Sequence, residues 1–305
     1  MQVAFLGELA ALGTATMWSL SSIGFTVSSQ RLGSVIVNRA RLLLATLFVA
    51  ATHWIIFGHP FPADAGTDRF AWLAVSAVIG LVIGDNMLFQ SYILVGTRIG
   101  VLLLSLSPIF SGILAWLLLG ETLAPLEVVA ILISLGGVAW VVLERRGDGA
   151  AGTRAISRRD YAIGIAFGVG AAFCQSLQLV LAKRGMAGDL SALSAVVIRM
   201  SVAAAVIWVL AAVRGEAAYT IRRVRAERQA SLSLLGATIA GPFIGVWLSL
   251  IAIQSARLGI ASTLMAMTPV LSLPLVHWYF KEKITRRALL GTLVAVAGVA
   301  MMLLV

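Results

Sequence analysis

Long apolar runs, separated by short turns that carry glycine, proline or charge, are the main pattern along this chain. Ten runs are expected, at about residues 5–27, 35–57, 70–95, 99–119, 124–143, 161–182, 192–213, 231–255, 259–280 and 286–305. A run of about 20 apolar residues is long enough to cross a bilayer as a helix. The runs lack the alternation of membrane barrel strands, and in lipid only helices and closed barrels satisfy their backbone groups. The pattern predicts an all-α integral membrane fold with ten transmembrane helices.

Two longer polar stretches interrupt the series. Residues 144–160 form the main linker, so the chain divides into a first five-helix repeat at 1–143 and a second at 161–305. Residues 214–230 are basic and predict either a loop or a short surface helix.

The second half of the chain repeats the first. The clearest matches, all at an offset of 161, are Ser107-Pro108 with Thr268-Pro269, Glu121 with Glu282, and Gly137 with Gly298. Around the third run and its exit, an offset of 159 pairs Arg69, Arg98 and Gly100 with Arg228, Arg257 and Gly259. The same offset sets Asp85 opposite Ile244. Because each half has five spans, the second half enters the membrane upside down. This is the inverted-repeat architecture of secondary transporters, which bind substrate near the midplane between repeats.

Composition narrows the class of protein further. Only 12% of the residues are charged, against about 25% in soluble domains. The net charge is +10, and the basic residues lie between the apolar runs. They form no basic stripe of the kind that binds nucleic acid. The single Cys174 excludes an internal disulfide and is expected to be a small packing residue. No Lys or Arg precedes the first run, which predicts a retained helix and not a cleaved signal peptide.

Several motifs now in view resemble a known family. Trp18-Ser19 in the first run, an arginine near the start of the second, LLLSLSP at 102–108, LLLGE at 117–121 and GGV at 136–138 are similar to the EamA type of the drug/metabolite transporter superfamily. The resemblance implies a ten-helix permease in the cell (inner) membrane, without a cofactor, that moves a small organic solute. It also implies a cavity formed by helices one, three and four and their counterparts six, eight and nine.

The distribution of basic residues and the family resemblance predict opposite orientations of the chain in the membrane. Of the 23 Lys and Arg residues, 18 lie in or beside the odd-numbered gaps, and the other five are Arg69, Lys183, Arg184, Arg199 and Arg257. The positive-inside rule then places the odd gaps in the cytoplasm and both termini outside. The family resemblance implies that both termini lie inside.

Asp85 is the strongest single candidate for a solute-binding residue. It lies about nine residues, or roughly 14 Å at 1.5 Å per residue, from the end of the third run at the odd-numbered gap. A carboxylate at this mid-bilayer depth is by default a functional hypothesis. Asp85, Phe89 and Tyr92 recur at i, i+4 and i+7, which is one helical face. The alternative is a structural role, in which Asp85 pairs with Arg41 or bonds a neighbouring Asn or Ser.

Tryptophans and amides on other runs are further candidates to line the cavity. Trp18 in the first run matches Cys174 at an offset of 156, and Gln175 and Gln178 share a face of the sixth run. Buried amides need partners, so these side chains are expected to point inward, and Trp247 in the eighth run joins them. Helix packing is the alternative for each.

Three arginines, Arg39, Arg41 and Arg199, lie in the first turns of their runs. Such long side chains can reach the membrane surface, form structural ion pairs or contact solute.

Two prolines, Pro108 and Pro269, are expected either to kink their helices structurally or to act as hinges for gating. Ser105, Ser107 and Thr268 beside them could satisfy the freed backbone or contact solute. Glu121 and Glu282 are expected to cap the helix that follows each of them.

Glycine-rich faces mark the fifth and tenth runs, at Gly136, Gly137, Gly291 and Gly298. They favour close helix approach, which fits either a homodimer contact or packing within the chain. His53 and His277 have no Asp, Glu or Cys at ligand spacing, so no metal site is predicted.

These inferences predict a secondary active or facilitative exporter of small organic metabolites, such as amino acids or drug-like solutes. It would work by alternating access between inverted repeats. A lipid-carrier flippase of the same fold is the main alternative. A membrane-embedded enzyme is disfavoured, because no clustered catalytic residues occur at either face.

Overall fold

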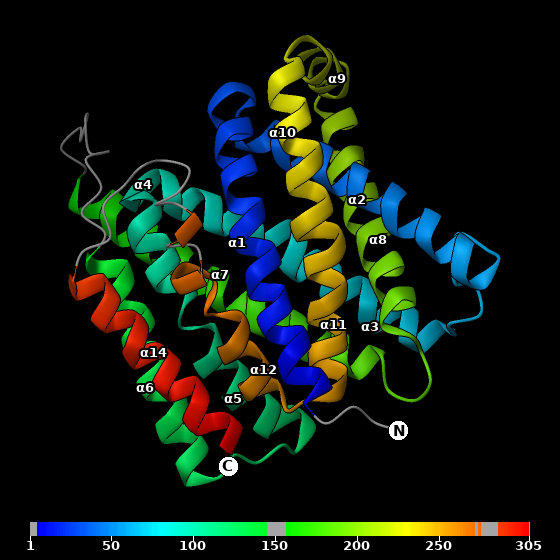
Figure 1. Ribbon diagram of the computed structural model, residues 1–305. Coiled ribbons are helices and arrows are strands. Elements are labelled where there is room, and N and C mark those ends of the chain that lie inside the picture. The colour runs from blue at the N-terminus through cyan, green and yellow to red at the C-terminus, as the bar shows by residue number, and fades with distance from the viewer. Residues whose placement is uncertain (1–4, 145–156, 272–273, 276–285, 305) are drawn as a thin grey trace. The chain divides into compact units, whose positions relative to one another are not determined.

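A computed structural model describes residues 5–144, 157–271, 274–275 and 286–304, and every regular element in these ranges is a helix (Figure 1). The elements are α1 (Leu6–Leu32), α2 (Ser34–Phe57), α3 (Thr67–Ala77), η1 (Val78–Gly84), α4 (Asp85–Leu104), α5 (Ser107–Leu119), α6 (Pro125–Glu144), α7 (Arg158–Gly185), α8 (Ala192–Val213), α9 (Ala217–Ala226), α10 (Arg228–Thr238), η2 (Ile239–Gly245), α11 (Val246–Ser255), α12 (Leu258–Met265) and α14 (Arg286–Leu304). The elements η1 and η2 are π-helical.

Length and hydropathy agree with a membrane fold. Among the described residues, five helical segments are long and apolar enough to cross a bilayer: Ser34–Phe57, Thr67–Leu88, Arg158–Gly185, Ala192–Val213 and Arg228–Ser255. Shorter apolar helices follow at Ser107–Leu119, Pro125–Trp140, Leu258–Leu271 and Leu289–Met301. The predicted all-α membrane class is confirmed.

The chain forms two compact units, and each draws helices from both sequence repeats. The first unit comprises Met1–Val78 and Leu181–Ala256, and therefore holds α1, α2, α3 and α8 to α11. The second comprises Ile79–Val180 and Arg257–Val305, and holds α4 to α6, most of α7, α12 and α14.

The expected turn at residues 96–98 is wrong. The helix that begins at Thr67 continues through η1 and α4 to Leu104, and the chain turns at Ser105–Leu106 instead. The glycines near 96–98 disfavour a helix by only about 1 kcal/mol each, which is too little to end one. Pro108 lacks the N–H that a continuing helix needs, so the break falls just before it.

The π-helical segments correct the alignment of the two repeats. Val78–Gly84 and Ile239–Gly245 are both seven residues long, and the offset between them is the same as that between the two prolines. The counterpart of Asp85 is therefore Val246, and the assignment to Ile244 is wrong. The arginine matches at 159 do not reflect equivalent helical positions.

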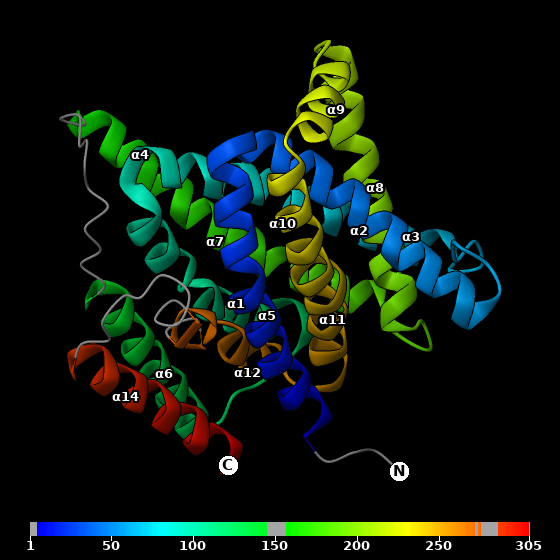
Figure 2. The same ribbon diagram turned by 45° about the horizontal axis from the view of Figure 1, so that its top comes forward.

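Glycines set the closest helix contacts within the second unit. A Cβ at Gly137 would collide with the backbone of Ala295, and one at Gly298 would collide with Ser134. These positions lie on α6 and α14, which run side by side in both views (Figures 1 and 2). Gly137 and Gly298 therefore serve packing within the chain, which was one of the two expected roles.

Candidate functional site

The π-helical segment η1 packs closely on α7 within the second unit. A Cβ at Gly80 would overlap the side chain of Gln178, and one at Gly84 would lie 3.0 Å from the Cβ of Cys174. Cys174 is thus a packing residue against a glycine. Single π turns inside α-helices occur frequently at functional sites, which draws attention to the residues that flank η1.

Asp85 directly follows η1 and begins α4, where its side chain is half-buried. Further along the same helix, Met87 and Ser91 face Gly170 and Gly168 of α7. At about 100° per residue, Asp85 points between about a third and just under half a turn away from this α7-facing side. The carboxylate therefore lies on a different face of α4 from the one that packs on α7.

Phe89 and Tyr92 share the Asp85 face by helical register. Their backbone belongs to α4, but their side chains lie outside the described part of the structure. Their expected role as rings beside the carboxylate stays a prediction.

Gln175 and Gln178 on α7 bond to each other. The Nε2 of Gln178 donates to the Oε1 of Gln175 at 2.6 Å, and Gln178 is buried against Gly80 while Gln175 is half-buried. Gln178 therefore contributes packing as well as polarity. Gln175 is the more accessible of the two amides.

Trp18 packs on the second π-helical segment, within the first unit. A Cβ at Gly241 would lie 3.3 Å from the Trp18 ring, and one at Gly245 would lie 3.4 Å from it. Thr14, one turn earlier on α1, donates to the Gly245 carbonyl at 3.3 Å. The absence of a side chain at both glycines thus makes room for the indole.

A chain of rings continues from η2. Phe243 stacks on Trp247 with ring centroids 6.3 Å apart, and Phe48 of α2 lies 5.9 Å from Phe243. Trp247 is half-buried. Like Asp85 in the other unit, it stands just after a π-helical segment.

The three arginines near helix starts are all buried in the structure. Arg39 forms an ion pair with Glu216 and donates to Thr220 at 3.1 Å. Arg41 donates from Nε to Asn38 at 2.7 Å, and its guanidinium lies 5.8 Å from the Phe25 ring centre. Arg199 is only 1% exposed. Of the roles expected, Arg39 has the structural ion pair.

The two prolines stand at helix starts, each after a short turn. Pro108 lies in the first turn of α5, where the missing N–H is tolerated. Ser107 donates to the Leu104 carbonyl at 2.7 Å, and Thr268, its counterpart in the second repeat, donates to the Met265 carbonyl at 2.8 Å. The two hydroxyls satisfy equivalent backbone carbonyls, so both repeats build the same break.

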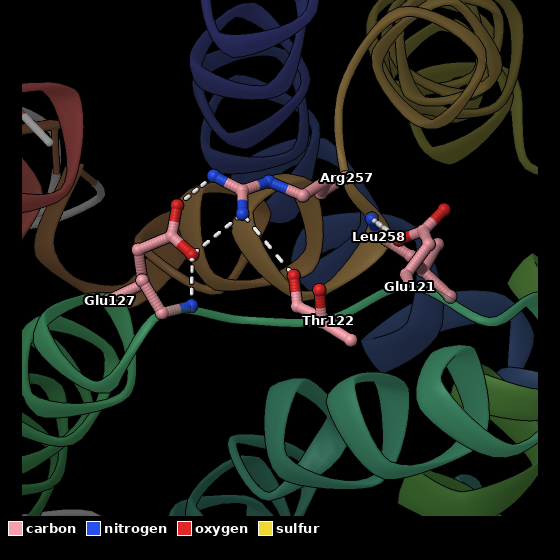
Figure 3. Close-up of polar contacts among 6 residues, drawn as sticks. Glu121, Thr122, Glu127, Arg257 and Leu258 are labelled. Atoms are coloured by element: carbon pink, nitrogen blue, oxygen red, sulfur yellow. Dashed lines mark hydrogen bonds and ion pairs between the residues drawn. The ribbon is translucent and has the colours of Figure 1, made fainter.

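Glu127 and Arg257, neither of which was assigned a functional role from the sequence, form an ion-pair clamp in the second unit (Figure 3). Both guanidinium nitrogens of Arg257 bond the two carboxylate oxygens of Glu127, one of them at 2.7 Å. The same guanidinium donates to the Thr122 carbonyl at 3.3 Å, and the Ala124 amide donates to Glu127 at 2.7 Å. The clamp joins the start of α12 to the loop between α5 and α6.

Glu121 caps a helix, but not the helix expected. Its carboxylate accepts from the Leu258 amide at 2.7 Å, so it caps α12 and not α6, which follows it in sequence (Figure 3). The first turn of α6 is served by Glu127 instead. Glu282 lies outside the described residues.

An open groove of about 380 Å³ adjoins the clamp. Its walls are apolar side chains of α5 and α6, including Ile109, Trp116 and Leu132, together with Glu121 and Thr122 of the connecting loop. It contains Pro108 but none of the predicted solute-binding residues.

The fold defines the class of protein: an α-helical membrane protein with a duplicated helical unit that contains matched π-helical segments. The family can then be named. The EamA-like transporter family matches residues 5–143 and again 162–304, so the chain belongs to this family and is a multi-pass membrane transporter.

A solved structure supports the same fold. A crystal structure of a protein with 17% identical residues covers 97% of this chain and 95% of its own, with a TM-score of 0.74. At this identity the similarity shows the fold alone. No curated protein matches the chain in sequence.

Proposed function

We propose that this transporter exports small organic metabolites, such as amino acids or drug-like amphipathic solutes, across the inner membrane of the cell. Transport is secondary active or facilitative and proceeds by alternating access between the inverted repeats. Asp85, Gln175, Trp18 and Trp247 contact the solute during the cycle, with Pro108 and Pro269 at the moving helix breaks.

The observation that carries this proposal is the pair of π-helical segments at matching positions in the two repeats. In lipid, irregular backbone is tolerated only where it is buried in protein or lines a water-filled cavity. Transporters use such interrupted helices to build midplane sites. In one repeat the segment is followed at once by Asp85, and in the other it is followed by Val246 and then Trp247.

The chemistry of the flanking residues supports the solute class. Aromatic rings at Trp18 and Trp247 suit an apolar body, and they can also attract a cationic group over the ring face. Asp85 would pair with a solute ammonium, and Gln175 offers an amide to a polar group. A solute with a charged amine and an apolar portion satisfies all three kinds of contact.

Flux into proteoliposomes tests the proposal. Purified protein is assayed for counterflow of labelled amino acids, purines and cationic dyes, and substitutions are then compared on any solute that is moved. Asp85→Asn is expected to reduce flux at least about tenfold, and Trp18→Phe less, because the substitution keeps a ring.

Two matched variants serve as controls. Asp64→Asn removes an exposed loop carboxylate, and Trp54→Phe alters an exposed ring on α2. Both should leave flux unchanged. Equal flux in Asp85→Asn and Asp64→Asn, or no flux of any solute in the panel, would count against the proposal.

A further inference from the structure

The basic stretch after α8 folds as a short amphipathic helix, α9, whose inner face packs on the protein. Thr220 is buried and Val224 packs on an apolar cluster. The buried members of this cluster are Leu32, Ile36, Val37, Ala40, Ala230 and Leu234. Figures 1 and 2 show α9 beyond the ends of α8 and α10.

Polar contacts fix the position of α9. Arg39 of α2 is buried and reaches both Glu216, just before α9, and Thr220 within it. Arg223 donates to the Arg31 carbonyl at the end of α1, at 3.0 Å. Because three contacts from two other helices hold it, the outer face of α9 is a defined surface.

The outer face of α9 is basic. Arg222 and Arg225 are exposed on it, and Arg214 and Arg228 are exposed just beyond its two ends. Among the described residues, neither Arg222 nor Arg225 has an ion-pair partner. The Glu216 carboxylate is already occupied by Arg39.

Exposed apolar side chains lie on α8 and at the start of α9, next to this basic face. On α8, Val209 is 61% exposed and Val213 is 81% exposed, and Tyr219 of α9 is 52% exposed. An exposed apolar stripe on a membrane-spanning helix faces acyl chains, whereas tyrosine is enriched at the level of the headgroups. The segment from Val213 through Arg214 to Tyr219 therefore runs from the hydrocarbon layer of the membrane into the headgroup layer.

We propose that α9 is a binding surface for anionic phospholipid. Arg222 and Arg225 bond the headgroup phosphates, since guanidinium groups match phosphate oxygens in paired hydrogen bonds. Val213 contacts the upper acyl chain, and Tyr219 lies at the level of the headgroups. Basic residues at an anionic membrane surface each strengthen binding by about fivefold, so the two arginines together account for at least about a tenfold preference over a zwitterionic lipid.

Native mass spectrometry of the purified, delipidated full chain tests this surface. The protein is titrated with phosphatidylglycerol and with phosphatidylcholine of the same acyl chains. The wild type is expected to retain phosphatidylglycerol at least about tenfold more strongly. Arg222→Gln with Arg225→Gln is expected to abolish most of that preference. Arg158→Gln with Arg159→Gln removes two exposed arginines at the start of α7 and is expected to keep it.

Equal retention of the two lipids by the wild type would overturn the proposal. An equal loss in both double variants would also overturn it, because net charge would then explain the preference. A measurement on the wild type alone gives an independent check. Amide exchange at residues 214–228 should slow in nanodiscs that contain phosphatidylglycerol, compared with phosphatidylcholine alone, and unchanged exchange contradicts the assignment.

Discussion

Arg257 and Glu127, which are 130 residues apart, meet in a bidentate ion pair at the start of α12. The pair has no copy in the other repeat: the positions related by the offset between the two prolines hold Gly96 and Ala288. At Gly96 the helix α4 also continues, whereas the chain breaks at Ala256–Arg257. Because inverted repeats place equivalent positions on opposite faces of the membrane, the clamp makes the two faces of this protein unequal.

Removal of the clamp should lower the stability of the protein. The Glu127 side chain is only 1% exposed, while that of Arg257 is 44% exposed. Loss of one partner of a fully buried pair costs about 3–5 kcal/mol, and the partial exposure of Arg257 reduces the expected effect of Glu127→Gln to about 1–3 kcal/mol. Thermal unfolding in detergent measures the loss.

A double-mutant cycle separates the clamp from the two single residues. If the ion pair is the cause, Arg257→Gln should add little further loss in a Glu127→Gln background. Additive losses would mean that each residue acts through other contacts. Asp64→Asn, an exposed carboxylate, should leave the unfolding temperature unchanged.

The cap on α12 gives a second, smaller prediction. Replacement of Glu121 by alanine removes the acceptor for the Leu258 amide and is expected to lower stability by about 1 kcal/mol, as for other helix caps. Glu121→Gln keeps an acceptor oxygen and should lose less. If the two variants unfold at the same temperature as the wild type, the cap has no part in the stability of α12.

The Arg39–Glu216 pair predicts a pH dependence. The hydrogen bond from Arg39 holds the pKa of Glu216 below its ordinary value of 4.5, with a smaller contribution from the charges of Arg39 and Arg214. A group with a lowered folded pKa adds stability above its unfolded pKa and loses it as the pH falls through the folded value. The difference in unfolding temperature between wild type and Glu216→Gln should therefore shrink as the pH is lowered from about 5 to about 3. A difference that is independent of pH would contradict this origin.

Local patterns in the sequence predicted much of the fold. The prolines at 108 and 269 mark the helix breaks because proline removes a backbone donor wherever it stands. The offset between these prolines is also the offset between the two π-helical segments. No sequence pattern predicted that these segments would be π-helical. Glycines at 96 and 100 were poor markers, since glycine weakens a helix without ending it.

Long-range pairing was beyond what the sequence could show. Glu121 was expected to cap its own neighbour, but the three-dimensional fold brings the start of α12 closer to its carboxylate. Arg257 and Glu127 each look like ordinary charged residues at helix ends in the sequence. Their structural role follows only from the ion pair that they form in the fold. Arg257 lies in one even-numbered gap and Glu127 lies in the first turn after another, which predicts that both are on one membrane face and was the single available hint.

The contact between α6 and α14 offers a matched pair of glycine substitutions. A Cβ at Gly137 would collide with the backbone of Ala295, whereas a Cβ at the adjacent Gly136 would meet nothing within 4 Å. Gly137→Ala should therefore force the helices apart and lower stability by about 1–3 kcal/mol. Gly136→Ala should be neutral or raise stability by up to about 1 kcal/mol through helix propensity. Thermal unfolding measures both variants. If Gly137→Ala instead left stability unchanged and altered the oligomeric state in detergent, the glycine would serve contact with a second copy of the chain.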